Sequence, residues 1–340
     1  MSTADAIFNK GVSAMTRIAT ASKALGINPQ KSAERYLCEE ISRGMSAVMK
    51  VRHIIKGGCI YLQPTRETRD LDITFARKIA DVEFYRAIRD MASMLAEKGI
   101  VITQVSKPAP LWINGDDGMR FEIEAKIGTA KIKTHVDVTG GSRQLPLNTP
   151  SRSVGSTFFA GQVPLHGFFQ SFESQVADKL ASVALRPDTT RWKDFTDLSM
   201  LSKMDLDKTI IAAELAYKLS FQFSTEEDVL AALPEIPATM SFEYVEEKGR
   251  VWKAWNERNG RKVSADFTDV ACDCRNFYHD IRQILVAKAR VDRKPRLRSR
   301  PAQQSYALQQ IRQEVRENKG NVIQMGDYRD PQTLAFKPKW

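Results

Sequence analysis

Two aspartates separated by one residue follow a pair of glycines. The segment KGGCIYLQPTRETRDLDITF, residues 56–75, contains Gly57, Gly58, Asp70 and Asp72. Alternate residues of a strand point to one face, so both carboxylates would lie side by side. Mg²⁺ binds through one or two carboxylates plus substrate phosphates. Glycines lack a Cβ, so their backbone N–H groups can approach a phosphate closely. The pattern predicts a phosphate cradle beside a cation site.

A third acid lies on a second strand-like segment. Asp137 belongs to KIKTHVDV, residues 131–138, in which apolar residues alternate with polar ones. A lone acid near a core is costly unless it has a partner. Three carboxylates on neighbouring strands form the metal site of a nucleotidyltransferase, where two ions orient a triphosphate and activate an attacking hydroxyl. We therefore expect Asp137 to join Asp70 and Asp72 around Mg²⁺ or Mn²⁺, with an NTP as substrate.

The order and spacing of these motifs resemble the AbiEii/AbiGii toxin family of nucleotidyltransferases. The resemblance covers roughly residues 32–205 and includes KGG-x11-DLD, Asp137, E-x5-K from Glu173 to Lys179, and RWKDFTDL at 191–198. It implies an α+β chain with a polymerase-beta-like nucleotidyltransferase core, a mixed sheet and a helical C-terminal domain. It also implies a toxin of a toxin–antitoxin or phage-defence pair, with a cognate antitoxin and transfer of an NMP to the 3′ end of tRNA.

Site residues follow from this resemblance by position. Cys59 stands where the family often has a small hydroxyl residue. The catalytic set is Asp70, Asp72, Asp137, Lys179 and Asp194, the metal ligands are Asp70, Asp72 and Asp137, and the nucleotide-binding set is Gly57, Gly58, Arg66, Thr68 and Lys179.

Lys179 borders the apolar stripe of a helical segment, so its ammonium needs a partner. One interpretation is a snorkelling stem with its charge in water. The family pattern favours a contact to the triphosphate that offsets charge in the transition state. Asp194 and Asp197 share a face of the next helix. We expect one to hold Lys179 or a water and the other to cap the helix or pair with Arg191.

The spacing of apolar residues predicts the helices and strands that would position these side chains. The first half is mixed, with helices at 32–51, opening at Ser32, and 81–100, ended by Gly99. Its strands lie at 53–55, 101–105, 120–127 and 131–138, the last two joined as a hairpin across Gly128-Thr129-Ala130. The second half is helical, with segments at 172–185, 191–203, 207–223 and 264–290. We divide the chain into an N-terminal extension 1–31, a nucleotidyltransferase core 32–205, a helical domain 206–290, and a basic segment and tail 291–340.

The net charge of the chain favours a polyanionic partner, and its cysteine count favours a reducing compartment. There are 51 Lys and Arg against 41 Asp and Glu, a net charge of +10. Four cysteines make no disulfide framework, and no apolar run approaches membrane-spanning length, so we expect a cytoplasmic protein without membrane contact. Cys272 and Cys274 lack a fourth metal ligand at sensible spacing, which favours structural thiols.

A basic run at 288–300 contains seven basic residues and one acid, and we expect it to hold RNA. Two alternatives stay open: nucleotidylation of a protein hydroxyl or small molecule, and a basic nucleic-acid-binding protein without catalysis. The three acids favour the enzyme, because binding alone has no need of them.

Overall fold

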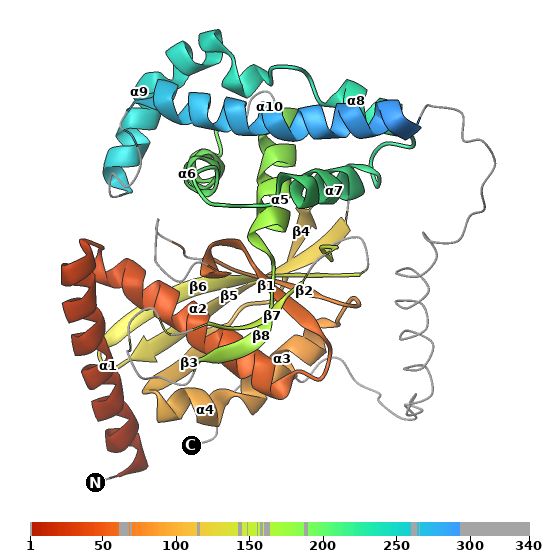
Figure 1. Ribbon diagram of the computed structural model, residues 1–340. Helices are drawn as coiled ribbons and strands as arrows, with labels where there is room; N and C mark the ends of the chain where they lie inside the picture. The colour runs from red at the N-terminus through yellow and green to blue at the C-terminus, as the bar shows by residue number, and fades with distance from the viewer. Residues whose placement is uncertain are drawn as a thin grey trace, which may run out of the picture. The chain divides into compact units, whose positions relative to one another are not determined.

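Figure 1 shows the computed structural model of the chain, which describes residues 2–60, 68, 70–113, 116–141, 145–147, 149–154, 156, 159, 164–186, 190–259, 264 and 266–292. The chain divides into two units, Met1–Val291 and Asp292–Trp340. The predicted site belongs to the first unit.

A mixed sheet of eight strands carries the predicted acids. Its order is β3-β5-β6-β2-β1-β8-β7, with β4 paired to β5. The pairs β2–β6 and β1–β8 are parallel. Strands β5 and β6 form an antiparallel hairpin as predicted, but Ala130 pairs with Ile127, so the turn is one residue shorter than predicted. The strands are β1 (His53–Lys56), β2 (Asp70–Phe75), β3 (Ile100–Val105), β4 (Ala109–Ile113), β5 (Asp116–Ile127), β6 (Ala130–Gly140), β7 (Ser151–Val154) and β8 (Leu165–Phe169).

Four helices accompany the sheet and share its hydrophobic core (Figure 1). They are α1 (Thr3–Leu25), α2 (Pro29–Val48), α3 (Asp81–Asp90) and α4 (Ala92–Glu97). Leu71 and Ile73 of β2 and Val136 and Val138 of β6 are buried in this core. Because side chains alternate along a strand, the residues between them point to the opposite face, where the predicted acids lie.

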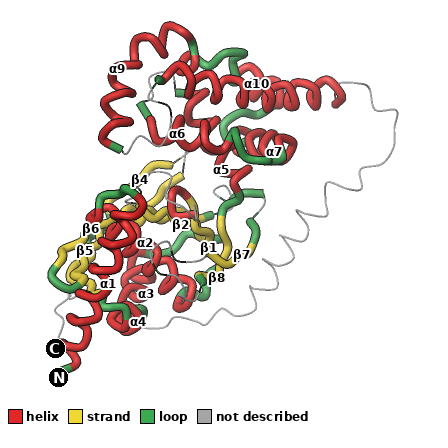
Figure 2. The backbone as a smooth tube through the Cα atoms, turned by 60° about the vertical axis from the view of Figure 1, so that its left-hand side comes forward, coloured by secondary structure: helices red, strands yellow, loops and turns green. Residues whose placement is uncertain are grey.

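The second half folds as helices around a separate core, as Figure 2 shows in red. They are α5 (Phe172–Leu185), α6 (Trp192–Leu201), α7 (Lys208–Leu219), α8 (Glu226–Ala232), α9 (Phe242–Arg258) and α10 (Phe267–Asp292). Trp252 is fully buried and stacks on Phe267, with ring centroids 5.0 Å apart. A mixed sheet followed by helices confirms the predicted α+β class.

Both helices predicted in the first half differ from the structure in their boundaries. Helix α2 begins at Pro29, not Ser32, because the Asn28 side chain caps it by accepting a hydrogen bond from the Gln30 N–H at 2.8 Å. The helix expected over 81–100 divides at Met91, whose ψ of −4° departs from regular helix geometry. The Met91 N–H still donates to the Ala87 carbonyl at 3.0 Å, so a helical hydrogen bond continues across the break.

Helix α1 was not expected from the sequence. Gly11 brings it against the turns that follow α4 and β5, and a Cβ at this position would lie 2.2 Å from the Gly128 nitrogen and 2.7 Å from the Gly99 oxygen. Three glycines thus allow backbone-to-backbone packing that no larger residue would permit. Within the described ranges, no helix has both the length and the apolar character needed to cross a bilayer.

Candidate active site

Neighbouring parallel strands bring three acids to one face of the sheet. Asp72 of β2 lies opposite Asp137 of β6, and Asp70 lies opposite His135. The side chain of Asp70 is 28% exposed, whereas that of Asp137 is 8% exposed. Asp70 and Asp72 share a face because they are two residues apart. The juxtaposition expected from strand alternation is therefore present.

The two glycines form a tight turn directly beside these acids. They open a 3-10 turn, Gly57–Ile60, that follows β1. Gly57 has a φ of +68°, and a Cβ there would lie 2.0 Å from Oδ2 of Asp72. A Cβ on Gly58 would lie 2.1 Å from Oγ1 of Thr68. The glycines therefore leave the space that the Asp72 and Thr68 side chains occupy, and their role as a phosphate cradle stays a prediction.

The charge of Asp72 is opposed by its surroundings. Burial, together with the charges of Asp70 and Asp137, raises the pKa of Asp72 to about 7, although Lys56 and Lys179 act in the other direction. A divalent cation would relieve this repulsion, and carboxylate oxygens are the donors that Mg²⁺ prefers. Among the residues that the structure describes, no group of three or more His, Cys, Asp or Glu side chains is arranged to hold a metal by itself. The donor set thus fits a cation held by two carboxylates and completed by substrate phosphates.

Arg120 of β5 holds the third acid and was missed by the sequence interpretation. Its Nε donates to Oδ1 of Asp137 at 2.7 Å and its Nη2 donates to Oδ2 at 2.6 Å. This contact and the nearby Asp70 and Asp72 charges raise the pKa of Arg120. The pair depends on a two-residue turn, which joins Ile127 to Ala130 and sets Arg120 opposite Asp137. The three-residue turn expected from the sequence would have set Arg120 opposite Val138 instead.

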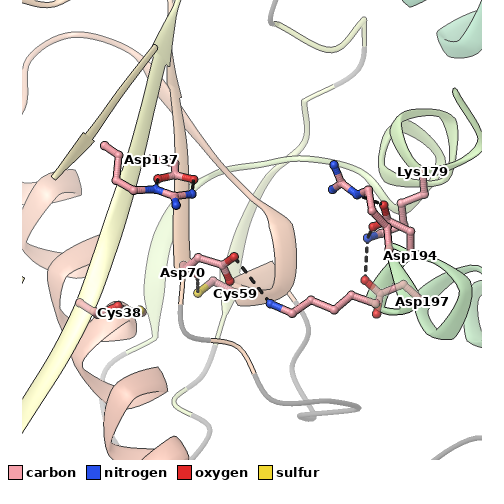
Figure 3. Close-up of polar contacts among 11 residues, drawn as sticks. Cys38, Cys59, Asp70, Asp137, Lys179, Asp194 and Asp197 are labelled. Carbon is pink, nitrogen blue, oxygen red and sulfur yellow. Dashed lines mark hydrogen bonds and ion pairs between the residues drawn. The ribbon is translucent and has the colours of Figure 1, made fainter. Parts of the chain in front are cut away.

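Lys179 of α5 lies buried between two aspartates of α6, as Figure 3 shows. Its Nζ lies 3.0 Å from Oδ1 of Asp194 and 2.6 Å from Oδ2 of Asp197. The snorkelling interpretation is therefore wrong. Asp194 also pairs with Arg191 at 2.5 Å, so this acid takes both of the roles that we divided between the two aspartates. A contact from Lys179 to a triphosphate stays a prediction.

Side chains of α5 and α6 reach the glycine turn and the acids. Gln175 donates to the Gly57 carbonyl at 3.0 Å. Nζ of Lys193 lies 3.9 Å from Oδ2 of Asp70, the contact drawn beside Asp70 in Figure 3. Lys193 stands within the predicted RWKDFTDL motif, yet sequence spacing did not single it out. The later motifs thus lie next to the first pair of acids.

Cys59 follows the two glycines directly in the 3-10 turn. Its side chain is buried, and its thiol donates to the Asp70 carbonyl at 3.5 Å. A contact with Cys38 and burial raise the pKa of the Cys59 thiol well above its usual range, so it stays protonated. Arg66 lies outside the described residues.

A match to a protein-family model shows which family the chain belongs to. The model for the nucleotidyl transferase AbiEii toxin of type IV toxin–antitoxin systems matches residues 56–287, well over half of the chain. The chain belongs to the AbiEii toxin family. Membership confirms the resemblance seen in the motifs and the expected nucleotidyltransferase fold. It makes the protein a nucleotidyltransferase enzyme, with an NTP as substrate and an antitoxin as the partner that the family implies.

The solved structures that are similar to this AbiEii-family chain share little of its sequence. A nucleotidyltransferase described as putative, from H. pylori, is 13% identical, with a TM-score of 0.46, covering 77% of this chain and 99% of that one. MenT4, a nucleotidyltransferase toxin from Mycobacterium tuberculosis H37Rv, is 13% identical, with a TM-score of 0.42, covering 79% of this chain and 98% of that one. No curated protein matches the sequence. The assignment therefore rests on the family match.

Proposed function

We propose that this enzyme transfers an NMP from an NTP to the 3′ end of tRNA in a Mg²⁺-dependent reaction. The observation that carries the proposal is the register of β2 and β6, which sets Asp70, Asp72 and Asp137 on one face beside the glycine turn. Such a site positions reactants and stabilises charge, which is most of what phosphoryl-type transfer requires.

In the proposed reaction, the 3′-hydroxyl oxygen of the RNA attacks the α-phosphorus of the NTP. A bond forms between these atoms while the α–β phosphoanhydride bond breaks, pyrophosphate leaves with the bonding electrons, and the hydroxyl proton passes to water. Asp70 and Asp72 would hold a divalent cation, which supplies positive charge to the triphosphate when bound. Gly57 leaves room for the Asp72 carboxylate, and Gly58 leaves room for the Thr68 hydroxyl. Lys193 adds a partly exposed positive charge near Asp70.

The setting of the proposed reaction is the cytoplasm, where the chain would act as the toxin of a phage-defence pair. All four cysteines are free, and the chain carries a net charge of +10. Free thiols suit a reducing compartment, and a basic protein suits an RNA acceptor.

Purified protein incubated with Mg²⁺, total tRNA and each α-³²P-labelled NTP in turn tests this function. We expect label in tRNA with at least one NTP. Label on protein or on a small molecule would replace the acceptor, and no label with any NTP would overturn the proposal. In cells, expression of the wild type should slow bacterial growth.

The first prediction concerns the metal-binding pair. The double substitution Asp70→Asn and Asp72→Asn keeps the shape of both side chains but removes their charge. NMP transfer should therefore fall about 10²-fold or more, as when a strong electrostatic contact is deleted. Label incorporation measures this loss, and circular dichroism checks the fold. Asp117→Asn, at an acid 72% exposed, is the matched control and should leave transfer unchanged. Near-normal transfer by the double variant would remove the assignment.

A further inference from the structure

The third acid of the site is already neutralised by a protein cation. Both oxygens of Asp137 accept hydrogen bonds from Arg120, at 2.7 and 2.6 Å, and the Asp137 side chain is only 8% exposed. A side-on guanidinium–carboxylate pair of this kind is geometrically specific and charge-assisted. A metal ion that approached Asp137 would meet the positive charge of Arg120 first.

This pair is built into the sheet and is not a chance surface contact. Arg120 lies directly opposite Asp137 in the β5–β6 register. Its neighbour Phe121 is fully buried in the core, so the pleat directs Arg120 to the face that carries the acids. The side chain needs no rearrangement to stay in this position, because the strands themselves hold it.

We propose that Arg120 takes the place of a second metal ion, so that this enzyme uses one divalent cation, on Asp70 and Asp72, for each bound nucleotide. The inference rests on the proposed function. Asp137 is then a positioning residue, which aims the Arg120 guanidinium at the nucleotide.

Charge and donor count both support a single cation. Arg120 offsets the charge of Asp137, which leaves Asp70 and Asp72 as the carboxylates for one divalent ion. A guanidinium has five N–H donors, and the pair with Asp137 uses two of them. Nη1 of Arg120 has no hydrogen-bond partner within the described part of the chain, and the side chain is 39% exposed. Its remaining donors are available to a phosphate oxygen.

Metal stoichiometry tests the proposal. Equilibrium dialysis of the full chain against Mn²⁺ and each α,β-methylene NTP analogue should give one protein-bound Mn²⁺ per bound nucleotide. Arg120→Gln frees Asp137, so the ratio should rise to two, and Arg120→Gln with Asp137→Asn should return it to one. Lys126→Gln changes an exposed residue on the same face of β5 and should keep the wild-type ratio.

Each outcome separates this proposal from the proposed function. Two Mn²⁺ per nucleotide in the wild type would overturn the single-cation inference and leave the transferase reaction intact. A ratio that stays at one in a folded Arg120→Gln variant would show that Arg120 does not exclude the second ion. Binding of neither nucleotide nor Mn²⁺ would overturn the proposed function itself. If Arg120→Gln does not fold, the wild-type ratio decides.

Discussion

Gly57 controls how closely the backbone approaches Asp72. Its φ of +68° lies in the left-handed region, and the space where a Cβ would stand is taken by the Asp72 carboxylate. Any side chain here meets both a backbone penalty of roughly 1–2 kcal/mol and a direct clash. The residue therefore links turn conformation to the position of a proposed metal ligand.

The second prediction is that Gly57→Ala displaces Asp72 and impairs transfer. The new methyl group must move a carboxylate that it would otherwise meet at 2.0 Å, so nucleotide-dependent Mn²⁺ affinity and NMP incorporation should both fall about tenfold or more. Gly249→Ala, where a Cβ meets nothing within 4 Å, is the control and should leave both unchanged. A fully active Gly57→Ala enzyme would contradict this account of the turn.

Helices α5 and α6 are joined by a buried ion network. Lys179 of α5 contacts Asp194 and Asp197 of α6, and all three are buried. Removing one partner from a buried pair leaves an uncompensated charge, which typically costs about 3–5 kcal/mol. Lys179 thus stabilises the packing of α5 against α6. Its charge also acts on Asp72 and favours the ionised carboxylate.

The third prediction separates these two roles. Lys179→Ala should lower the free energy of unfolding by about 3 kcal/mol, measured by denaturant titration. In the fraction that folds, KM for NTP should rise and kcat should fall if Lys179 also serves the triphosphate. Lys208→Ala, which removes an exposed pair with Asp280, is the control and should change stability by less than about 1 kcal/mol. Unchanged stability of Lys179→Ala would contradict the structural role.

At the scale of the molecule, a second ion cluster connects the sheet to the helices. Asp178 of α5 lies 3.7 Å from Lys56 of β1 and 2.5 Å from Lys218 of α7. Burial alone would raise the pKa of Asp178, but the two ammonium groups outweigh it and hold this pKa well below its usual range. The cluster therefore ties β1, beside the glycine turn, to the helical core.

The fourth prediction is a pH dependence of stability. Because the folded pKa of Asp178 is depressed, its contribution is complete above the unfolded pKa of about 3.9 and is lost as the pH falls through the folded value. The free energy of unfolding should thus fall less steeply below about pH 4 in Asp178→Asn than in the wild type. At pH 7 the variant should be less stable, because two partly buried ammonium groups lose their counter-charge. Parallel pH profiles for both proteins would contradict the cluster.

The fifth prediction concerns the basic run 288–300, which lies outside the described residues from 293 onward. Changing Arg293, Lys294, Arg296 and Arg298 to Gln should weaken tRNA binding. Each phosphate contact contributes about 0.7–0.9 to the slope of log K against log salt, so the slope should flatten by roughly three. NTP binding should be unchanged. An unaltered RNA affinity and slope would show that the run serves another partner, such as an acidic antitoxin.

Local patterns in the sequence determined much of the site. Strand alternation predicts that Asp70 and Asp72 share a face, and motif order indicates the family before any coordinate is known. The β5–β6 hairpin was predicted from its glycine turn, but its register was not, because the turn contains only Gly128 and Thr129 and so sets Arg120 opposite Asp137. These features depend on residues near one another along the chain, so periodicity and turn chemistry specify them.

Tertiary structure alone decided how distant segments meet. Periodicity places Lys179 at the edge of an apolar stripe, but only helix packing shows its ammonium between Asp194 and Asp197 and not in water. Likewise, the parallel pairing that sets Asp72 beside Asp137 joins strands separated by two helices and three other strands. Burial of a charge and the partner that offsets it depend on which elements pack together, and no local pattern carries that information.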